Sequence, residues 1–372
     1  MSRFVQLHLL TFYAPSNLNR DDLNRPKTAH VGGVQRLRVS SQSLKRAWRT
    51  SDVFDCFGAQ VGEGDRALRT RDFRKLVFKP LVDGGLEPAQ AATWTDKVMD
   101  NYKKKAGTKE KKEKDKEKKS ISLDAKERFE FGHMLCLSAQ EVAAIRGVVT
   151  ALVNRQNPSD ADLAKVLQKQ ETNTAVDLAM FGRMLADKPD FNVDAAVQVA
   201  HAFTVNKATV EDDFFTAVDD LNKREEDAGA GHMGEVEFGS GVFYLYICVD
   251  CDLLKKNLAG RPDLVRPAMR ALAEAAATVA PTGKQNSFAS RAYAQYLLAE
   301  KGDRQPRSLA VAFLRPVAGA DQVGEAIERL RACRADMDRA YGALADDFRE
   351  MSVPTQEGAL AQVLDFVGEA CA

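Results

Sequence analysis

A short strand runs directly into a helix in the sequence Arg36-Leu37-Arg38-Val39-Ser40-Ser41-Gln42-Ser43-Leu44-Lys45-Arg46-Ala47-Trp48-Arg49. The first four residues have the long and branched side chains of an extended segment. Ser40 or Ser41 can accept hydrogen bonds from the free amides at the start of a helix, which we expect to end near Ser51. The apolar side of this helix is formed by Leu44, Ala47 and Trp48. The stretch therefore predicts a strand–helix unit that packs through one helix face.

The segments on either side of this unit extend the alternation. Residues 3–13, closed by Pro15, predict a first strand, and residues 16–34 contain the Pro and Gly of a loop. Residues 55–200 read as mainly helical. Beyond them we expect strands at 201–206, 242–249, 287–298 and 308–313, and helices at 261–279 and 321–347. With two long insertions set aside, the order is strand, helix, strand, strand, helix, strand. This α+β order is the ferredoxin-like arrangement of RNA-recognition motifs.

The overall composition places few limits on function. The chain has 372 residues, 45% of them hydrophobic, and its 53 basic residues balance its 53 acidic ones. A nucleic-acid partner must therefore be argued from local charge. The N-terminus lacks the pattern of a signal peptide and no apolar run is long enough to span a membrane, so we expect a soluble cytoplasmic protein.

The six cysteines do not form a metal-binding pattern. In a cytoplasmic protein we expect them to be reduced thiols. Cys248-x-x-Cys251 has the spacing of a zinc or redox pair, but no second pair of ligands completes a site. Cys248 follows an apolar run, so we interpret it as a buried strand residue.

Positive charge is concentrated at the N-terminal end. Residues 1–50 hold nine Lys and Arg against two acids, a net charge of +7. Lys45, Arg46 and Arg49 lie within one helical turn, where like charges repel unless a polyanion neutralises them. Arg36, Arg38 and Gln42 are close in sequence. This pattern favours contact with phosphates over a solvated helix face.

Two other segments are strongly charged. Residues 103–119 hold ten Lys and four acids, and a surface insertion and a polyanion contact both remain open for them. Residues 210–237 hold ten acids and two bases and read as a long excursion between paired strands. Phe214-Phe215-Thr216 lies inside this acidic excursion. The aromatic pair is either a small core within the loop or a surface that stacks on bases.

No pattern of residues predicts catalysis. The sequence has no Gly-rich phosphate loop, no GxSxG and no HExxH. The nearest candidate is Asp21-Asp22, flanked by Arg20 and Arg25. Two carboxylates beside a nucleic-acid surface could bind a metal ion for strand cleavage, or they could hold the neighbouring arginines in place.

Several blocks of sequence resemble a known family. They are Asn17-Leu18-Asn19-Arg20-Asp21-Asp22, Gly32-Gly33, Arg38 to Ala47, Met180-Phe181-Gly182-Arg183-Met184, His201-Ala202, Phe215 to Leu221 and Phe238 to Tyr244. In this order they resemble the CasC-type (Cas-seven family) backbone subunit of the type I-E CRISPR Cascade complex. The anchoring blocks run from residue 16 to about residue 250.

The resemblance implies a hand-shaped subunit. Its palm, residues 1–54 and 242–372, would be an RNA-recognition-motif-like domain; its fingers would be a helical insertion at 55–200; and its thumb would be a hairpin excursion at 201–241. Copies would polymerise head-to-tail along the guide spacer of a CRISPR RNA. Each thumb would reach over a neighbour and displace one nucleotide, which leaves the other bases free to pair with target DNA. No enzymatic activity, cofactor or metal is implied.

The resemblance also implies partners and site residues. The partners are the large and small Cascade subunits, the end subunits that bind the handle and process the RNA, and a helicase-nuclease recruited indirectly. Guide phosphates would be held by Asn19, Arg20, Arg38, Ser40, Gln42, Lys45, Arg46 and Arg49. Phe215 and Thr216 would lie at the displaced nucleotide with Phe214 supporting them, Met180 would pack against guide bases, and Lys284 with Gln285 would touch the RNA again.

One departure from the family pattern concerns the fingers. Further basic residues that face target DNA are expected there, and the run at 103–119 is a candidate for them. Related type III backbone subunits cleave RNA through a loop aspartate. A ribonuclease that uses Asp21 or Asp22 is therefore the alternative to a non-catalytic scaffold.

Overall fold

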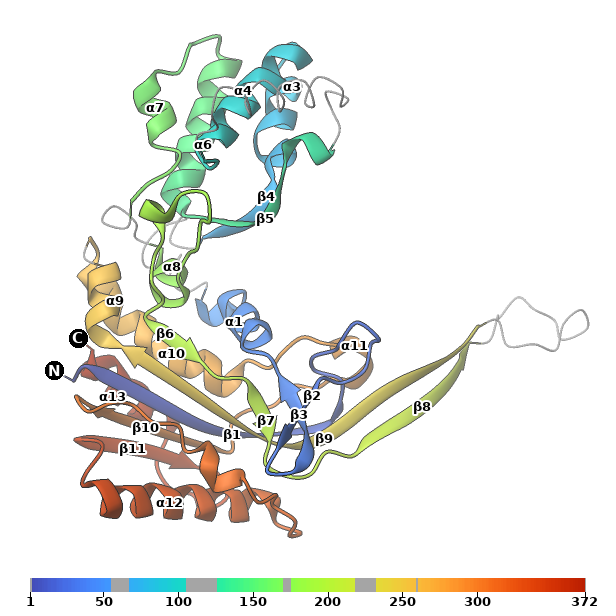
Figure 1. The fold of residues 1–372 in the computed structure, drawn as a ribbon, viewed down its shortest axis with the longest axis vertical. Coiled ribbons are helices and arrows are strands. Elements are labelled where there is room, and N and C mark those ends of the chain that lie inside the picture. Colours follow the sequence, from blue (N-terminus) through green and yellow to red (C-terminus); the bar gives the residue numbers. More distant parts are fainter. Residues whose placement is uncertain are drawn as a thin grey trace, which may run out of the picture. The chain divides into compact units, whose positions relative to one another are not determined.

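The chain forms two compact units with an α+β fold (Figure 1). The computed structural model describes residues 2–54, 67–104, 126–169, 175–217, 232–258 and 260–371. The first unit comprises Met1–Asp55, Val197–Asp252 and Val265–Ala372, and the second comprises Cys56–Ala196 and Leu253–Leu264. Most of the lysine-rich run at 103–119 lies outside the described residues. The division into palm, fingers and thumb stays a prediction.

An antiparallel sheet is the centre of the first unit. Its strand order is β11-β10-β1-β9-β7-β3-β2, and β6 and β8 also pair with β9. The central strand β1 pairs with β9 on one side and with β10 on the other. The strands are β1 (Phe4–Ser16), β2 (Thr28–Val31), β3 (Val34–Val39), β6 (Val197–Val199), β7 (Ala202–Thr204), β8 (Val210–Ala217), β9 (His232–Asp250), β10 (Tyr296–Gly302) and β11 (Asp347–Ser352).

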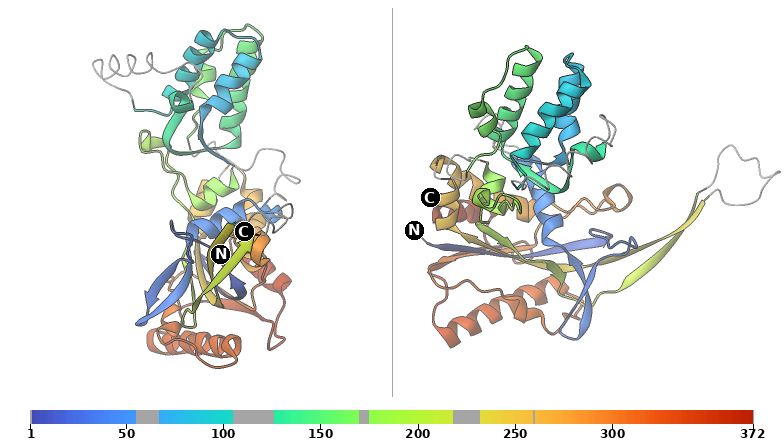
Figure 2. Two further views of the ribbon diagram at one scale, coloured as in Figure 1. Left: turned by 90° about the vertical axis from the view of Figure 1, so that its right-hand side faces the viewer. Right: turned by 45° about the horizontal axis from the view of Figure 1, so that its top comes forward.

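Helices cover both faces of this sheet (Figures 1 and 2). On one face, α10 (Val265–Thr278) packs against β1, α1 (Ser41–Arg49) and α13 (Leu360–Ala370). On the other face, α12 (Gln322–Tyr341) packs against β1. A buried apolar core joins α12 to the sheet through residues such as Tyr244, Tyr296, Leu298, Ile327 and Leu330. The remaining short helices of this unit are α11 (Gln285–Phe288) and η6 (Ala310–Phe313). α9 (Cys251–Asn257) begins at the end of β9 and continues into the second unit, which also contains η5 (Pro262–Leu264).

A two-stranded hairpin extends from the sheet (Figure 2). It pairs β8 with the first part of β9, from Val210 opposite Gly239 to Ala217 opposite His232. The rest of β9 continues into the sheet beside β1. β9 is therefore much longer than the strand predicted at 242–249, and it continues without a break from the hairpin into the sheet.

The second unit contains helices and a small sheet. Its two strands, β4 (Leu68–Asp72) and β5 (Glu130–Leu137), are antiparallel. Its helices are η1 (Arg74–Phe78), α3 (Lys79–Asp83), α4 (Pro88–Asp100), η2 (Lys126–Phe129), α6 (Ala139–Val153), α7 (Asp160–Ala164), α8 (Val176–Phe181) and η4 (Pro189–Phe191). The core is built around Phe73, Phe129, Phe131 and Ile145. The sequence predicted helices here and missed the small sheet.

Of the two strands predicted in the C-terminal part, the one at 308–313 is wrong and the one at 287–298 begins too early. Residues 310–313 form the helical turn η6, in which Leu309 and Phe313 are both buried against the α12 face of the sheet. The hydroxyl of Tyr244 accepts from the backbone N–H of Leu309, and Ser308 Oγ accepts from that of Ala310, so neither amide joins a strand ladder. In the segment 287–298, a helical turn occupies Gln285–Phe288 and β10 begins only at Tyr296. The sequence analysis also missed β11 and α13.

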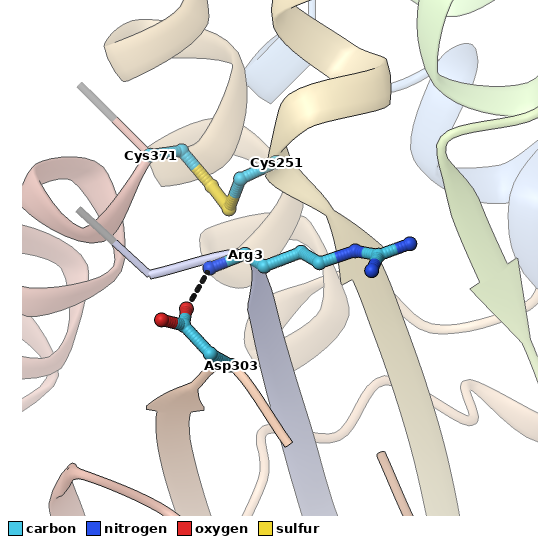
Figure 3. The surroundings of a disulfide bond; sticks show 4 residues. All are labelled: Arg3, Cys251, Asp303 and Cys371. Atoms are coloured by element: carbon cyan, nitrogen blue, oxygen red, sulfur yellow. Dashed lines mark hydrogen bonds between the residues drawn. A yellow bond between two sulfur atoms is a disulfide. The ribbon is translucent and has the colours of Figure 1, made fainter. Parts of the chain in front are cut away.

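A disulfide joins Cys251, the first residue of α9, to Cys371 after the end of α13 (Figure 3). The expectation of reduced thiols is wrong for this pair, because 120 residues separate the two and no local pattern marks them. Next to Cys251, the backbone of Arg3 accepts from the Cys251 amide, and the Arg3 N–H donates to Asp303. The disulfide therefore fastens the C-terminal helix to the end of the sheet at which β1 begins and β9 ends.

Cys248 is a free, buried thiol, since Cys251 is bonded to Cys371. It is 3% exposed in β9, and burial raises the pKa of its thiol to about 11. The interpretation of Cys248 as a buried strand residue is confirmed. No helix in the described ranges is both long enough and apolar enough to cross a membrane.

Candidate nucleic-acid interface

The loop between β1 and β2 is held by its own hydrogen bonds. The Asp21 carboxylate accepts from the backbone N–H groups of Leu23 and Arg25, each at 2.9 Å. The buried Asn17 side chain donates to the carbonyls of Asn24 and Glu237, which ties the loop to the base of the hairpin. Such Asx turns fix a backbone without any ligand. Asp21 therefore has a structural role.

The same loop is joined to the start of α1. Ser40 Oγ accepts from the backbone N–H of Ser43 and so caps the helix, as the sequence predicts. Asn19 Oδ1 accepts from the backbone N–H of Ser40 at 2.9 Å. In these two bonds the side chains of Asn19 and Ser40 act as acceptors through their oxygen atoms. The Asn19 side-chain NH2 group can therefore donate to an anion. Ser40 itself is buried, and its first role is to position α1.

A cleft of about 480 Å³ opens between this loop, α1 and the turn at residues 282–283. Three of the residues predicted to hold guide phosphates, Asn19, Arg20 and Arg46, line it. Its other lining residues are Leu18, Asp21, Asn24, Ser43, Ala47, Thr50, Thr282 and Gly283. Guanidinium, amide and hydroxyl groups dominate these walls, which suits a phosphate backbone better than an apolar ligand.

Gly283 allows the third wall of the cleft to approach the loop. A Cβ at this position would lie 2.2 Å from the Leu18 carbonyl oxygen and 2.8 Å from that of Asn17. Backbone atoms cannot yield as a flexible side chain can. Lys284 follows in the left-handed region, with φ of 49°, and is half-buried. The turn that presents Lys284 therefore depends on a glycine before it.

Replacing Gly283 by alanine is expected to push the 282–283 turn away from the loop. We expect the free energy of unfolding to fall by about 1–3 kcal/mol. The dissociation constant for single-stranded RNA should rise about tenfold, since a wall of the cleft moves. Thermal unfolding and fluorescence anisotropy measure the two effects. Gly147→Ala is the control, because a Cβ there meets nothing within 4 Å. RNA affinity in Gly283→Ala equal to that of Gly147→Ala would contradict this role of the turn.

A second group of cations lies beside the cleft residues. Arg38 on β3 donates from Nη1 to His201 Nδ1 at 2.6 Å. The pKa of His201 is lowered, first by partial burial and then by the positive charges of Arg38, Lys27 and Lys45. These four side chains come from four separate segments of the first unit: the residue before β2, β3, α1 and the residue before β7. We name them the cation cluster: Lys27, Arg38, Lys45 and His201.

Three residues singled out in the sequence are buried. Arg36 is 0% exposed, and its guanidinium donates to the backbone carbonyls of Thr204, Val205 and Phe313. It holds β3 to its neighbours, so Arg36 does not add to the exposed cations near α1.

Two residues that the resemblance places at the RNA are also buried. Arg49 is 7% exposed and Met180 is 0% exposed. Of the predicted helix cations, Arg46 is exposed and Lys45 is half-buried.

The hairpin shows Phe215 and Phe214 on opposite faces. Phe215 lies opposite Gly234, and a Cβ on Gly234 would lie 2.6 Å from the Phe215 ring, so the ring covers that glycine. Phe214 is 61% exposed and shares the other face with Thr216 and Met233, which is also 61% exposed. Residues alternate between the faces of a strand. Phe215 and Thr216 therefore cannot present their side chains to the same side.

The described part of the hairpin is acidic. Residues 210–217 and 232–237 contain five acids and no Lys or Arg. Asp212 lies directly opposite Glu237, a like-charge pair that destabilises a ribbon in isolation. Arg25 of the β1–β2 loop relieves part of this charge through an ion pair of 3.0 Å with Glu237. The remaining acids are available to a basic partner.

Sequence reasoning missed three residues. Lys27 and His201 belong to the cation cluster, and the signal for His201 was its place in the block His201-Ala202. Met184 is 78% exposed, whereas Met180 in the same block is buried. Met180 lies inside α8, while Gly182, with φ of 75°, ends that helix and releases the following residues to the surface.

The described residues contain no group of three or more His, Cys, Asp or Glu side chains that could hold a metal ion. Asp22, the second carboxylate of the proposed cleavage pair, is exposed. Asp21 is engaged by its own loop. The geometry of the described loop offers no support to the ribonuclease alternative.

Comparison with known proteins gives two kinds of match. The sequence model of the family described as CT1975-like protein matches residues 5–367. A chain of a solved structure titled "CRISPR RNA-guided surveillance complex, pre-nicking" is 29% identical with a TM-score of 0.77, over 99% of this chain and 100% of that one. A chain of a second structure, titled "CRISPR RNA-guided surveillance complex", is 26% identical with a TM-score of 0.60 over the same shares. The curated proteins include no match to this sequence.

Proposed function

The chain belongs to the CT1975-like family, the CasC-type backbone proteins of the Cascade surveillance complex, and from this premise we propose that it binds the guide part of a CRISPR RNA without catalysing a reaction. We propose that the protein is a subunit of a type I-E complex and that each complex contains several copies of it in the cytoplasm. Its partners would be the large, small and end subunits of the complex, target DNA paired to the guide, and a helicase-nuclease recruited indirectly.

The observation that carries the proposal is the polar cleft beside the cation cluster. Arg20, Arg46 and the Asn19 amide line the cleft, and Arg38 and Lys45 lie in the cluster. Contacts of this type recognise phosphate and sugar and carry no sequence information. A backbone subunit must bind guides of any sequence, so it needs contacts that do not depend on the bases. The bases of the guide stay free and recognise the target by pairing. Gln42, which is exposed on α1, and Lys284 are proposed to extend the phosphate path.

The sheet supports a palm of the RNA-recognition-motif type. Its inner strands run in the order β10-β1-β9-β7, with α1 between β1 and β7 in the chain and α10 between β9 and β10. This is the strand order of a split βαβ fold. The phosphate site would lie at the end of β1 and the start of α1, and not on the open face of the sheet, because α12 covers one face and α10 the other.

The acidic hairpin supports a role as the thumb. A head-to-tail array needs two different, complementary surfaces on each copy. The five described acids of the hairpin would contact the basic surface of the next copy, and opposite charges would set register. Phe215 would lie at the displaced nucleotide, with Thr216 and Phe214 on the opposite face toward the neighbouring copy. In the second unit, the exposed Met184 replaces the buried Met180 as our candidate for packing against guide bases.

Replacing Phe215 by alanine is expected to remove the regular pattern of displaced nucleotides in the assembled complex. The ring both covers Gly234 and offers a stacking surface worth about 1–3 kcal/mol per base. Chemical probing of the RNA in the purified complex reads the pattern. Phe214→Ala is the matched control on the other face of β8, and it should keep the pattern. A regular pattern that persists in Phe215→Ala would remove Phe215 from the displaced position.

A further inference from the structure

The hydrogen bond between Arg38 and His201 defines the protonation state of the His201 imidazole in the free protein. An arginine can only donate, so Nδ1 of His201 must be the acceptor of the 2.6 Å bond from Arg38 Nη1. The imidazole is therefore neutral, with its proton on Nε2. His201 is an exposed residue immediately before β7, so its Nε2–H can reach a ligand from outside.

Among the described residues, the charged groups that lower the pKa of His201 are all cations. Arg38 approaches from β3, Lys27 from the segment before β2, and Lys45 from α1. No ion pair in the described ranges joins His201 to a carboxylate, whereas the buried His8 does contact one, Glu300. In the part of the chain that the structure describes, no carboxylate therefore stabilises an imidazolium at this position. A neutral His201 is held there among three positive charges.

We propose that His201 is a phosphate-binding residue of the guide site and that it takes up one proton when RNA binds. This inference rests on the proposed function. A phosphate placed in the cation cluster offsets part of the repulsion between these cations and a protonated His201, because a nearby opposite charge favours the charged form of a titratable group. The proton comes from solvent and binds Nδ1. Arg38 then releases the ring and donates to a phosphate oxygen, while the imidazolium donates to phosphate through Nε2.

The sign of the pH dependence follows from this exchange. RNA raises the pKa of His201 relative to the free protein, so binding consumes a proton and is favoured at low pH. Between the free and the bound pKa, the dissociation constant rises up to about tenfold for each pH unit, which is the limit for one linked proton. Above the bound pKa, His201 stays neutral and its contribution is lost.

The test compares three forms of the full-length chain for binding to single-stranded RNA from about pH 6 to about pH 8 at constant salt. The wild type should bind several-fold more weakly at the upper end. His201→Gln, which keeps a polar side chain but cannot titrate, should show a flat profile close to the wild-type affinity at high pH. His30→Gln is the control, since His30 is an exposed histidine of β2 outside the cation cluster, and it should keep the wild-type slope.

A second measurement follows the ring itself in the wild type, which avoids any effect of substitution on folding. The proton resonance of the His201 imidazole should titrate at a higher pH with RNA bound than without it. An unchanged titration, or a wild-type slope in His201→Gln, would overturn the inference while leaving the proposed function intact. Absence of RNA binding at every pH would instead overturn the proposed function.

Discussion

Replacing Arg38, Lys45 and Arg46 together by alanine is expected to weaken the binding of single-stranded RNA by about a hundredfold or more at moderate salt. Two of these cations belong to the cation cluster, and the third lines the cleft. Each phosphate contact with a single strand contributes about 0.7 to the slope of log affinity against log salt. The loss of three contacts should therefore reduce the magnitude of that slope by about 2.

The control for this variant must remove the same charge from elsewhere. Arg266, Arg315 and Arg339 are exposed cations of the first unit that lie outside the cleft and the cation cluster. Their triple alanine variant has the same net charge as the site variant. We expect it to keep the wild-type salt slope within about one contact, or about 0.7. Equal losses in the two variants would show that RNA senses only total charge, and the phosphate site would be wrong.

Replacing Arg183 by methionine is expected to destabilise the second unit by about 3–5 kcal/mol. The Arg183 guanidinium contacts both oxygens of Glu141, at 2.9 and 2.8 Å, and both side chains are completely buried. Arg183 also donates to the backbone carbonyls of Gln168 and Phe191. The substitution leaves the Glu141 carboxylate buried and without its countercharge. Such a charge is costly in a low-dielectric interior.

Calorimetry of the full chain measures this effect. The transition of the second unit should move down by about 10 °C, while that of the first unit stays in place. Lys165→Ala is the matched control, because Lys165 forms an exposed ion pair of 3.3 Å with Asp162 in the same unit. Exposed pairs contribute about 0–1 kcal/mol. A shift in Arg183→Met as small as that in Lys165→Ala would show that the buried pair does not stabilise the unit.

Features with a local cause could be predicted from sequence. β1 was visible because its branched and aromatic residues form a continuous run, and α1 because a capping serine precedes an apolar stripe. Ser40 does cap the helix as predicted. The concentration of basic residues also pointed to the loop and helix that form the cleft.

Features that depend on distant neighbours could not be predicted. Arg36 and Arg38 are two residues apart on one strand, yet Arg36 is buried because carbonyls from residues 204, 205 and 313 surround it. Apolar residues at 309, 311 and 313 alternate as in a strand, but Leu309 and Phe313 are also one helical turn apart. The Tyr244 hydroxyl accepts from the backbone N–H of Leu309, which stabilises the helical turn. The disulfide joins segments 120 residues apart.

The measurement that tests the central claim most directly is the extraction of nucleic acid from the protein purified together with its partner subunits and a CRISPR array. The account predicts an absorbance ratio at 260 and 280 nm typical of a nucleoprotein, and RNA of one discrete length that is protected at regular intervals. Protein that is free of nucleic acid under these conditions would contradict the account, because a backbone subunit with this cleft and cation cluster must retain its guide.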